Sequence, residues 1–128
     1  MPSKTFAGKI EEVLVDLKAL TPDVEGAVLV DMNGLPITSV ISDGVNDTLV
    51  AAMASAMLRM GERTVDELHK GKLQRVLVQA EKGYVVLVEA GQDAVLAVVT
   101  TERAKLGMVF VDANLAAVKV AKLLADRR

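Results

Sequence analysis

Three apolar segments joined by very short connectors constrain the fold of this chain most. We expect strands at 73–80, 84–89 and 94–100, linked only by 81–83 and 90–93. A parallel crossover needs a dozen or more residues, so these strands must form consecutive antiparallel hairpins. The segments 85–88 and 94–99 hardly alternate in polarity. That pattern is typical of strands covered on both faces, and it predicts helices on the two sides of one sheet.

The rest of the chain supplies two more strands and three helices. An apolar strand at 26–31 enters the turn Asn33-Gly34, and Pro36 keeps a second strand extended over 36–41. Apolar residues at helical spacing predict helices at 5–20, 46–70 and 106–126. Asn46 or Asp47 caps the central helix, and Gly71 is expected to end it. The order predicts an α/β (α+β) three-layer sandwich with a five-stranded antiparallel sheet, and we expect residues 1–128 to form a single domain.

Composition excludes several classes of function. The net charge of −2 and the 2% of aromatic residues argue against a nucleic-acid-binding surface. There is no cysteine, which excludes disulfides and thiolate chemistry, and no apolar run is long enough for a membrane span. Met1–Lys4 show no signal peptide, so a cytoplasmic protein is expected. At 52%, the hydrophobic share suggests that some apolar residues are buried against another chain.

The central helix carries more apolar surface than packing on one sheet requires. On a helical wheel Leu49, Met53 and Met60 share one side, while Val50 and Leu58 extend the apolar arc round the next. A stripe of about 100° suffices for one contact, and this arc is nearly twice as wide. We therefore expect this helix to pack against its own copy about a two-fold axis. The alternative is that other parts of the same chain cover it.

The strand at 73–80 is a second expected contact. It follows the central helix, and as a bare apolar sheet edge it would pair with another strand. The predicted dimer interface joins the two elements through Val50, Ala54, Met57, Leu58, Gly61, Val65, Leu73, Arg75, Val76, Leu77, Val78 and Gln79.

We expect no enzyme active site, no cofactor and no metal site. His69 is the only histidine, and near a helix end it is typical of a solvated side chain. Asp31-x-Asn33 imitates the start of a calcium loop, but the sixth position is Pro36 and the twelfth is Ser42. Nucleophile-elbow and phosphate-loop motifs do not occur.

Several segments in a fixed order carry a family resemblance. They are VEGAVLVD at 24–31, NGLP at 33–36, AA at 51–52, GKL at 71–73, AVLAVVT at 94–100 and LGMV at 106–109. Together they resemble the Roadblock / dynein light chain family over about residues 10–124. The resemblance implies sheet order 2-1-5-4-3, with the first and last helices on one face and the central helix on the other. It also implies homo- or heterodimers that join their third strands and pair their central helices.

The resemblance also implies a partner. Prokaryotic members of the family act with Ras-like small GTPases as activating proteins or scaffolds, and eukaryotic members belong to dynein and to lysosomal GTPase-regulating scaffolds. We therefore expect a dimeric regulator that docks a GTPase through the polar strip of the central helix: Ser55, Arg59, Glu62, Arg63, Asp66 and His69. One alternative is a structural adaptor in a motor or membrane-associated assembly, with no effect on GTP turnover. Another is a small-molecule sensor, against which the scarcity of aromatic residues counts.

Overall fold

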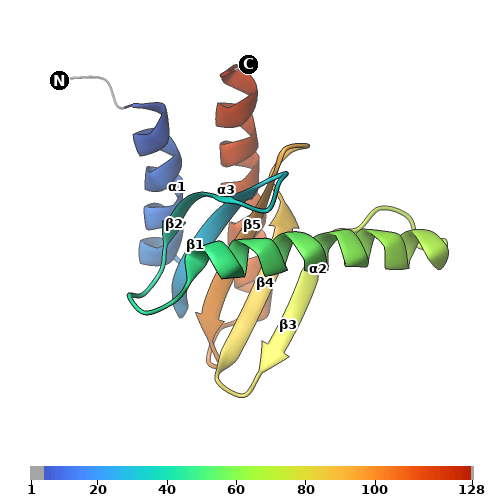
Figure 1. The fold of residues 1–128 in the computed structure, drawn as a ribbon. Coiled ribbons are helices and arrows are strands. Elements are labelled where there is room, and N and C mark those ends of the chain that lie inside the picture. The colour runs from blue at the N-terminus through green and yellow to red at the C-terminus, as the bar shows by residue number, and fades with distance from the viewer. Residues whose placement is uncertain (1–4, 128) are drawn as a thin grey trace.

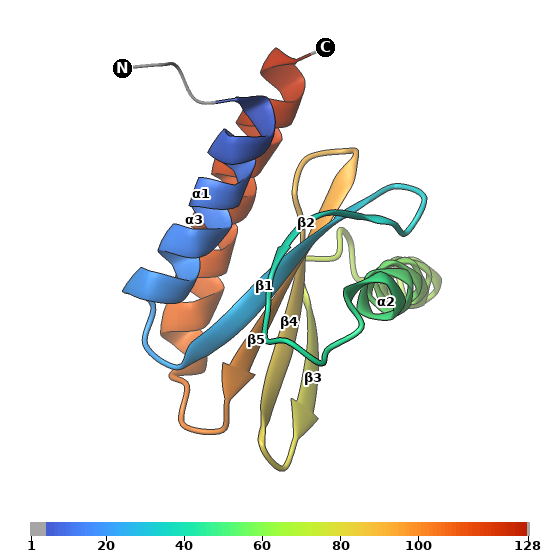
Figure 2. The same ribbon diagram turned by 60° about the vertical axis from the view of Figure 1, so that its left-hand side comes forward.

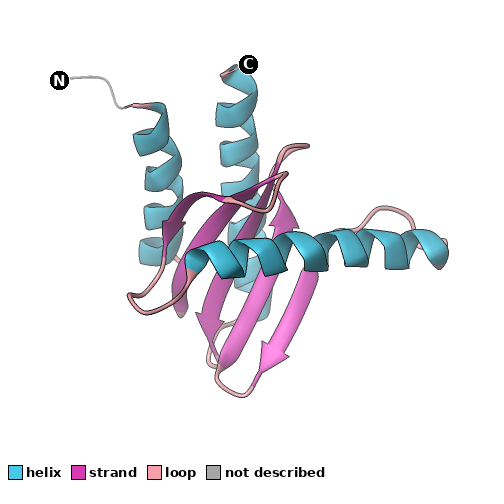
Figure 3. Cartoon of the chain, viewed as in Figure 1, coloured by secondary structure: helices cyan, strands magenta, loops and turns pink. Residues whose placement is uncertain are grey.

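The computed structural model of the chain describes residues 5–127, so Met1–Lys4 lie outside the described residues. Its three helices and five strands follow the predicted order (Figure 3). They are α1 (Phe6–Leu20), β1 (Val24–Asp31), β2 (Pro36–Val40), α2 (Asp47–Glu67), β3 (Val76–Ala80), β4 (Gly83–Glu89), β5 (Ala94–Thr101) and α3 (Leu106–Asp126). Most boundaries lie within two residues of those expected from the sequence, and α3 has the predicted bounds.

The five strands form one antiparallel sheet in the order β2-β1-β5-β4-β3. Helices α1 and α3 lie side by side on one face of this sheet, and α2 crosses the other face (Figures 1 and 2). The predicted three-layer sandwich and strand order are therefore confirmed. β5 lies at the centre of the sheet, and β2 and β3 form its two edges.

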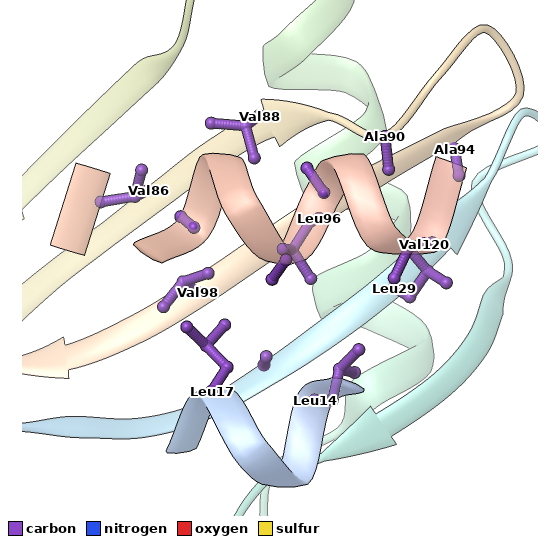
Figure 4. Close-up of a cluster of buried hydrophobic side chains, with 14 of the residues drawn as sticks. Leu14, Leu17, Leu29, Val86, Val88, Ala90, Ala94, Leu96, Val98 and Val120 are labelled. Carbon is purple, nitrogen blue, oxygen red and sulfur yellow. The ribbon is translucent and has the colours of Figure 1, made fainter. Parts of the chain in front are cut away.

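The core between the sheet and the α1/α3 layer is the larger of the two. Large aliphatic side chains fill it, including Leu14 from α1, Leu29 and Leu96 from the sheet, and Val120 from α3 (Figure 4). Each of these four has an exposed fraction of 0%. Two amphipathic helices thus bury their apolar stripes on one side of the sheet, as the spacing of their apolar residues requires.

A smaller core lies between the sheet and α2. Val28 and Leu87 from the sheet meet Ala51, Ala54 and Leu58 from the helix. Alternate residues of β1 and β4 therefore point into different cores, since Val28 belongs to this core and its neighbour Leu29 to the larger one. That double covering explains why these strands do not alternate in polarity.

The segment between α2 and β3 differs from the sequence prediction. Helix α2 ends three residues earlier than expected, because the left-handed residue that closes it is His69 (φ 55°), two residues before Gly71. The His69 N–H donates to the Asp66 carbonyl and the Lys70 N–H donates to the Val65 carbonyl, the pattern of a Schellman cap. β3 begins only at Val76, so the prediction of a strand from residue 73 is wrong.

None of the helices within residues 5–127 is long and apolar enough to cross a membrane.

Candidate protein-interaction surface

Helix α2 is held at its start by side chains that the sequence places there. The Asn46 side chain accepts a hydrogen bond from the Leu49 N–H (3.1 Å), which satisfies one of the free donors of the first turn. The Ser39 hydroxyl donates to the Asp47 carboxylate (2.8 Å) and ties the same turn to β2. The direction of α2 across the sheet is thus fixed at its N-terminal end.

The inner side of α2 consists of small residues. Ala51, Ala54, Ser55 and Leu58 are buried against the sheet. Ala54 and Leu58 are only 1% and 4% exposed, so these two residues of the predicted dimer interface pack against the sheet within the chain. The physical reason is size, because alanines let the helix approach the sheet closely enough to cover β4 and β5.

The outer side of α2 carries large apolar side chains that this chain leaves uncovered. We call it the methionine face: Leu49, Met53, Met57 and Met60. Their exposed fractions run from 36% to 67%. A contiguous apolar surface of this kind is typical of protein-interaction sites, and flexible methionines suit partners of varied shape. The excess apolar arc predicted from the sequence is therefore real, and it points away from the sheet.

The second half of α2 has little support from its own sheet. Leu58 is the last buried residue of α2, and the helix passes the edge strand β3 at Gly61. A Cβ placed on Gly61 would lie 3.0 Å from Val76 Cγ2 and 3.3 Å from Leu73, so glycine permits this close crossing. Beyond it the helix projects past β3 (Figure 1). We call residues 62–67 the overhang.

The edge strand that α2 passes at Gly61 is short, mostly apolar and uncharged. β3 pairs with β4 alone, from Val76 opposite Leu87 to Ala80 opposite Gly83. It lacks the lysines or prolines that normally protect a sheet edge. Arg75, just before it, does not join this surface as predicted. Its guanidinium stacks on the Phe110 ring of α3 (4.4 Å to the centroid), on the opposite side of the sheet.

The predicted docking residues separate into two groups. Ser55, Arg59 and Glu62 line a hollow between α2, the β1–β2 turn and the β4–β5 turn. Arg63, Asp66 and His69 are exposed further along the helix. The structure brings the first three together at one place, although Ser55 itself is only 7% exposed.

Arg59 has an internal role that the sequence did not indicate. Its guanidinium donates a hydrogen bond to the Met32 carbonyl in the β1–β2 turn. The same turn is shaped by Asp31, whose carboxylate accepts from the Asn33 N–H (2.9 Å) and the Leu35 N–H (3.0 Å). Gly34 completes it at a positive φ of 81°. Arg59 thus fastens this turn to α2 at the rim of the hollow.

Sequence reasoning missed the remaining residues that line this hollow. They come from the β1–β2 turn and from the β4–β5 turn: Asp31, Met32, Glu89, Gly91, Gln92, Asp93, Ala94 and Val95. The Asp-x-Asn-Gly motif marked the first turn as distinctive, but only the sheet order places it beside the second. Within residues 5–127 no group of three or more acidic or histidine side chains is arranged to hold a metal ion.

The comparisons with known proteins agree with this architecture. The Roadblock/LC7 domain family model matches residues 9–100 of the chain. The chain belongs to the Roadblock/LC7 family. The resemblance inferred from the sequence is thereby confirmed, and α3 lies outside the residues that the family model matches.

Individual relatives of this Roadblock/LC7 protein match it over most of its length. The uncharacterized protein MJ1340 of Methanocaldococcus jannaschii is 34% identical over 111 residues, which is 87% of this chain and 96% of the relative. A structure of MglB with a tetrameric arrangement superposes with a TM-score of 0.86 at 20% identity, covering 100% of this chain and 96% of the other. A Roadblock/LC7 domain from Streptomyces avermitilis gives 0.83 at 21% identity, covering 89% and 96%. These two structures share the fold.

Proposed function

We propose that this chain is a dimeric, non-enzymatic regulator of a Ras-like small GTPase. The observation that carries the proposal is the methionine face, an exposed apolar helix surface directly beside an unprotected sheet edge. Membership of the Roadblock/LC7 family supports it, because the prokaryotic members that the sequence resembles act with such GTPases.

The dimer forms through β3 and the overhang. Two copies related by a two-fold axis join their β3 edges into one continuous sheet, and each overhang then lies above the partner's sheet. The interface comprises Val50, Met57, Gly61, Val65, Leu73, Val76, Leu77, Val78 and Gln79, which is the predicted set without Ala54, Leu58 and Arg75. The tetrameric arrangement of MglB supports self-association of chains with this fold.

The GTPase docks on the surface that the paired α2 helices create. Leu49, Met53 and Met60 of the methionine face supply apolar contact, while Glu62, Arg63, Asp66 and His69 supply charged and polar contacts beside it. Binding one conformation of the GTPase switch loops more tightly than another would shift their equilibrium and thereby change the rate of nucleotide turnover.

Light scattering of the purified protein at low concentration, where the weaker association described below does not contribute, tests the dimer. We expect a mass of twice the 13.6 kDa chain, and we expect Val65→Glu to give a monomer because it places a charge in the overhang. Val45→Glu, on an exposed residue before α2, is the matched control and should stay dimeric. Circular dichroism establishes that both variants are folded. A monomeric wild type, or a dimeric Val65→Glu, would contradict the proposed dimer.

Single-turnover GTP hydrolysis tests the partner. A purified Ras-like GTPase encoded in the same genome is loaded with GTP and mixed with the dimer. We expect a changed rate of hydrolysis or nucleotide release, and at least a tenfold weaker effect with Met53→Glu. Met108→Glu is the control, since both methionines are 48% exposed but lie on opposite faces. A dimer that binds no such GTPase would refute the regulator and favour the structural adaptor.

A further inference from the structure

The outer surface of α3 carries a second apolar stripe, on the opposite side of the sheet from α2. Met108, Val111, Leu115 and Val118, which we call the α3 stripe, are between 48% and 66% exposed. Their steps of three, four and three residues match the a and d positions of a coiled-coil heptad. A stripe with this spacing is complementary to another helix.

A groove beside the stripe widens this surface. It lies between α1 and α3, has a volume of about 310 Å³, and is lined by Leu17, Leu20 and Leu115 together with charged residues of both signs. Leu20 is 78% exposed, the largest exposure among the bulky apolar residues of the described chain. Asp112 on its wall is held in place by the Thr21 hydroxyl, which donates to its carboxylate (2.8 Å).

We propose that α3 packs antiparallel against α3 of a second copy of this chain. The charges beside the stripe identify both the occupant and its register. When Leu115 faces Val118 of the second copy, Asp112 lies opposite Lys119 of that copy, and Lys105 lies opposite its Asp126. The two-fold axis repeats each pairing, so four opposite-charge contacts flank the seam. Within the seam Leu115 meets Val118, Met108 meets Ala125, and Val111 meets the aliphatic part of Lys122.

The charges disfavour the neighbouring antiparallel register and the parallel arrangement. Shifting by one heptad would pair Met108 with Val118 and Val111 with Leu115, but would also set Asp112 beside Asp112 and Lys105 beside Lys119, which is repulsive. A parallel pair would bring Lys119 opposite Asn114 and would align the two helix dipoles unfavourably. The residues on the other flank of the stripe carry no charge, so they favour neither the antiparallel nor the parallel arrangement. They are Gly107, Asn114 and Ala121.

This contact is independent of the proposed α2 dimer because the sheet separates the two surfaces (Figure 2). The α3 stripe spans only about 15 Å along the helix axis, at 1.5 Å per residue. We therefore expect a concentration-dependent association that adds a second copy to whatever oligomer the α2 face forms.

Cysteine cross-linking tests the register, since the chain contains no cysteine of its own. In the proposed pairing Met108 lies next to Ala125 of the second copy. A mixture of Met108→Cys and Ala125→Cys proteins should therefore form a heterotypic disulfide dimer under mild oxidation. Met108→Cys alone should stay unlinked, because two copies of residue 108 would lie about 25 Å apart. Rapid self-linking of Met108→Cys, or preferential linking to Val118→Cys, would overturn the proposal.

Sedimentation over a range of concentrations tests the contact itself and separates it from the α2 dimer. Val65→Glu protein, which is expected to be monomeric at the low concentration of the light-scattering test, should show a monomer–dimer equilibrium at higher concentrations. We expect Val118→Glu to weaken that equilibrium at least tenfold. Val15→Glu is the matched control, because Val15 is 44% exposed on α1 but does not line the groove, and it should leave the equilibrium unchanged. If Val65→Glu protein stays monomeric at all concentrations, the α3 contact is refuted and the α2 dimer is unaffected.

Discussion

The two faces of the sheet are covered in different ways. Two helices with long aliphatic side chains cover one face, and a single helix with alanines on its inner side covers the other. The first arrangement buries a large core within the chain. The second buries little, and its helix keeps its large side chains outside and extends beyond the sheet (Figure 1). The comparison teaches that the larger core lies on the α1/α3 side, while the α2 side leaves large apolar side chains exposed.

Paired leucine truncations are the strongest way to test this difference. Leu96 and Leu87 are both 0% exposed, but Leu96 points toward α1 and α3 whereas Leu87 points toward α2. We expect Leu96→Ala to lower the free energy of unfolding by about 3–5 kcal/mol and Leu87→Ala by about 2–3 kcal/mol, because fewer large neighbours surround the second cavity. Urea denaturation at one fixed protein concentration measures both. If Leu87→Ala lowers the free energy of unfolding as much as Leu96→Ala does, or more, the two faces do not differ in stability as described.

Enlarging an alanine beneath α2 should have a smaller effect. Ala51 is fully buried between the helix and the sheet. Ala51→Leu is expected to cost about 1–3 kcal/mol, because the added side chain pushes α2 outward. Hydrogen exchange should then accelerate in α2 while α1 and α3 keep their protection. Acceleration spread evenly over all three helices would show that the two faces are not separate units of stability.

Removing a helix cap should have the smallest of these effects on stability. Asn46 accepts from the Leu49 N–H in α2, and Thr5 accepts from the Gly8 N–H in α1 (3.0 Å). Replacing either with alanine should cost about 1 kcal/mol in thermal or urea unfolding. Asn46→Ala should in addition weaken dimerisation in light scattering, since it loosens the helix that carries the proposed interface. Thr5→Ala serves as its control, and a loss of dimer there would argue against the α2 face.

Most of the fold could be predicted from the sequence because its signals are local. The short connectors required antiparallel hairpins, and the unbroken apolar run at 94–99 indicated a strand covered twice. The helix end at His69 could not be predicted, because a histidine in the left-handed conformation is unusual and Gly71 stood close by.

The candidate site was predicted less completely, for reasons of packing. A helical wheel counts alanine and methionine alike as apolar, so it could not decide which sector of α2 meets the sheet. The structure decides by size, with Ala54 inside and Met53 outside. Two contacts join residues that are far apart in the sequence: Arg75 stacks on Phe110, and Arg59 donates a hydrogen bond to the Met32 carbonyl. No local sequence pattern indicates such contacts.

In the proposed dimer the overhang couples assembly to helix formation. Most helical stability in proteins comes from packing of an apolar face, and the chain's own sheet hardly supports residues 62–67. In a separated chain we expect these turns to fray and reform, and a molecule that covers them would also complete the helix. Binding at this end of α2 would then be a small folding reaction, and part of its free energy would be used to order the backbone.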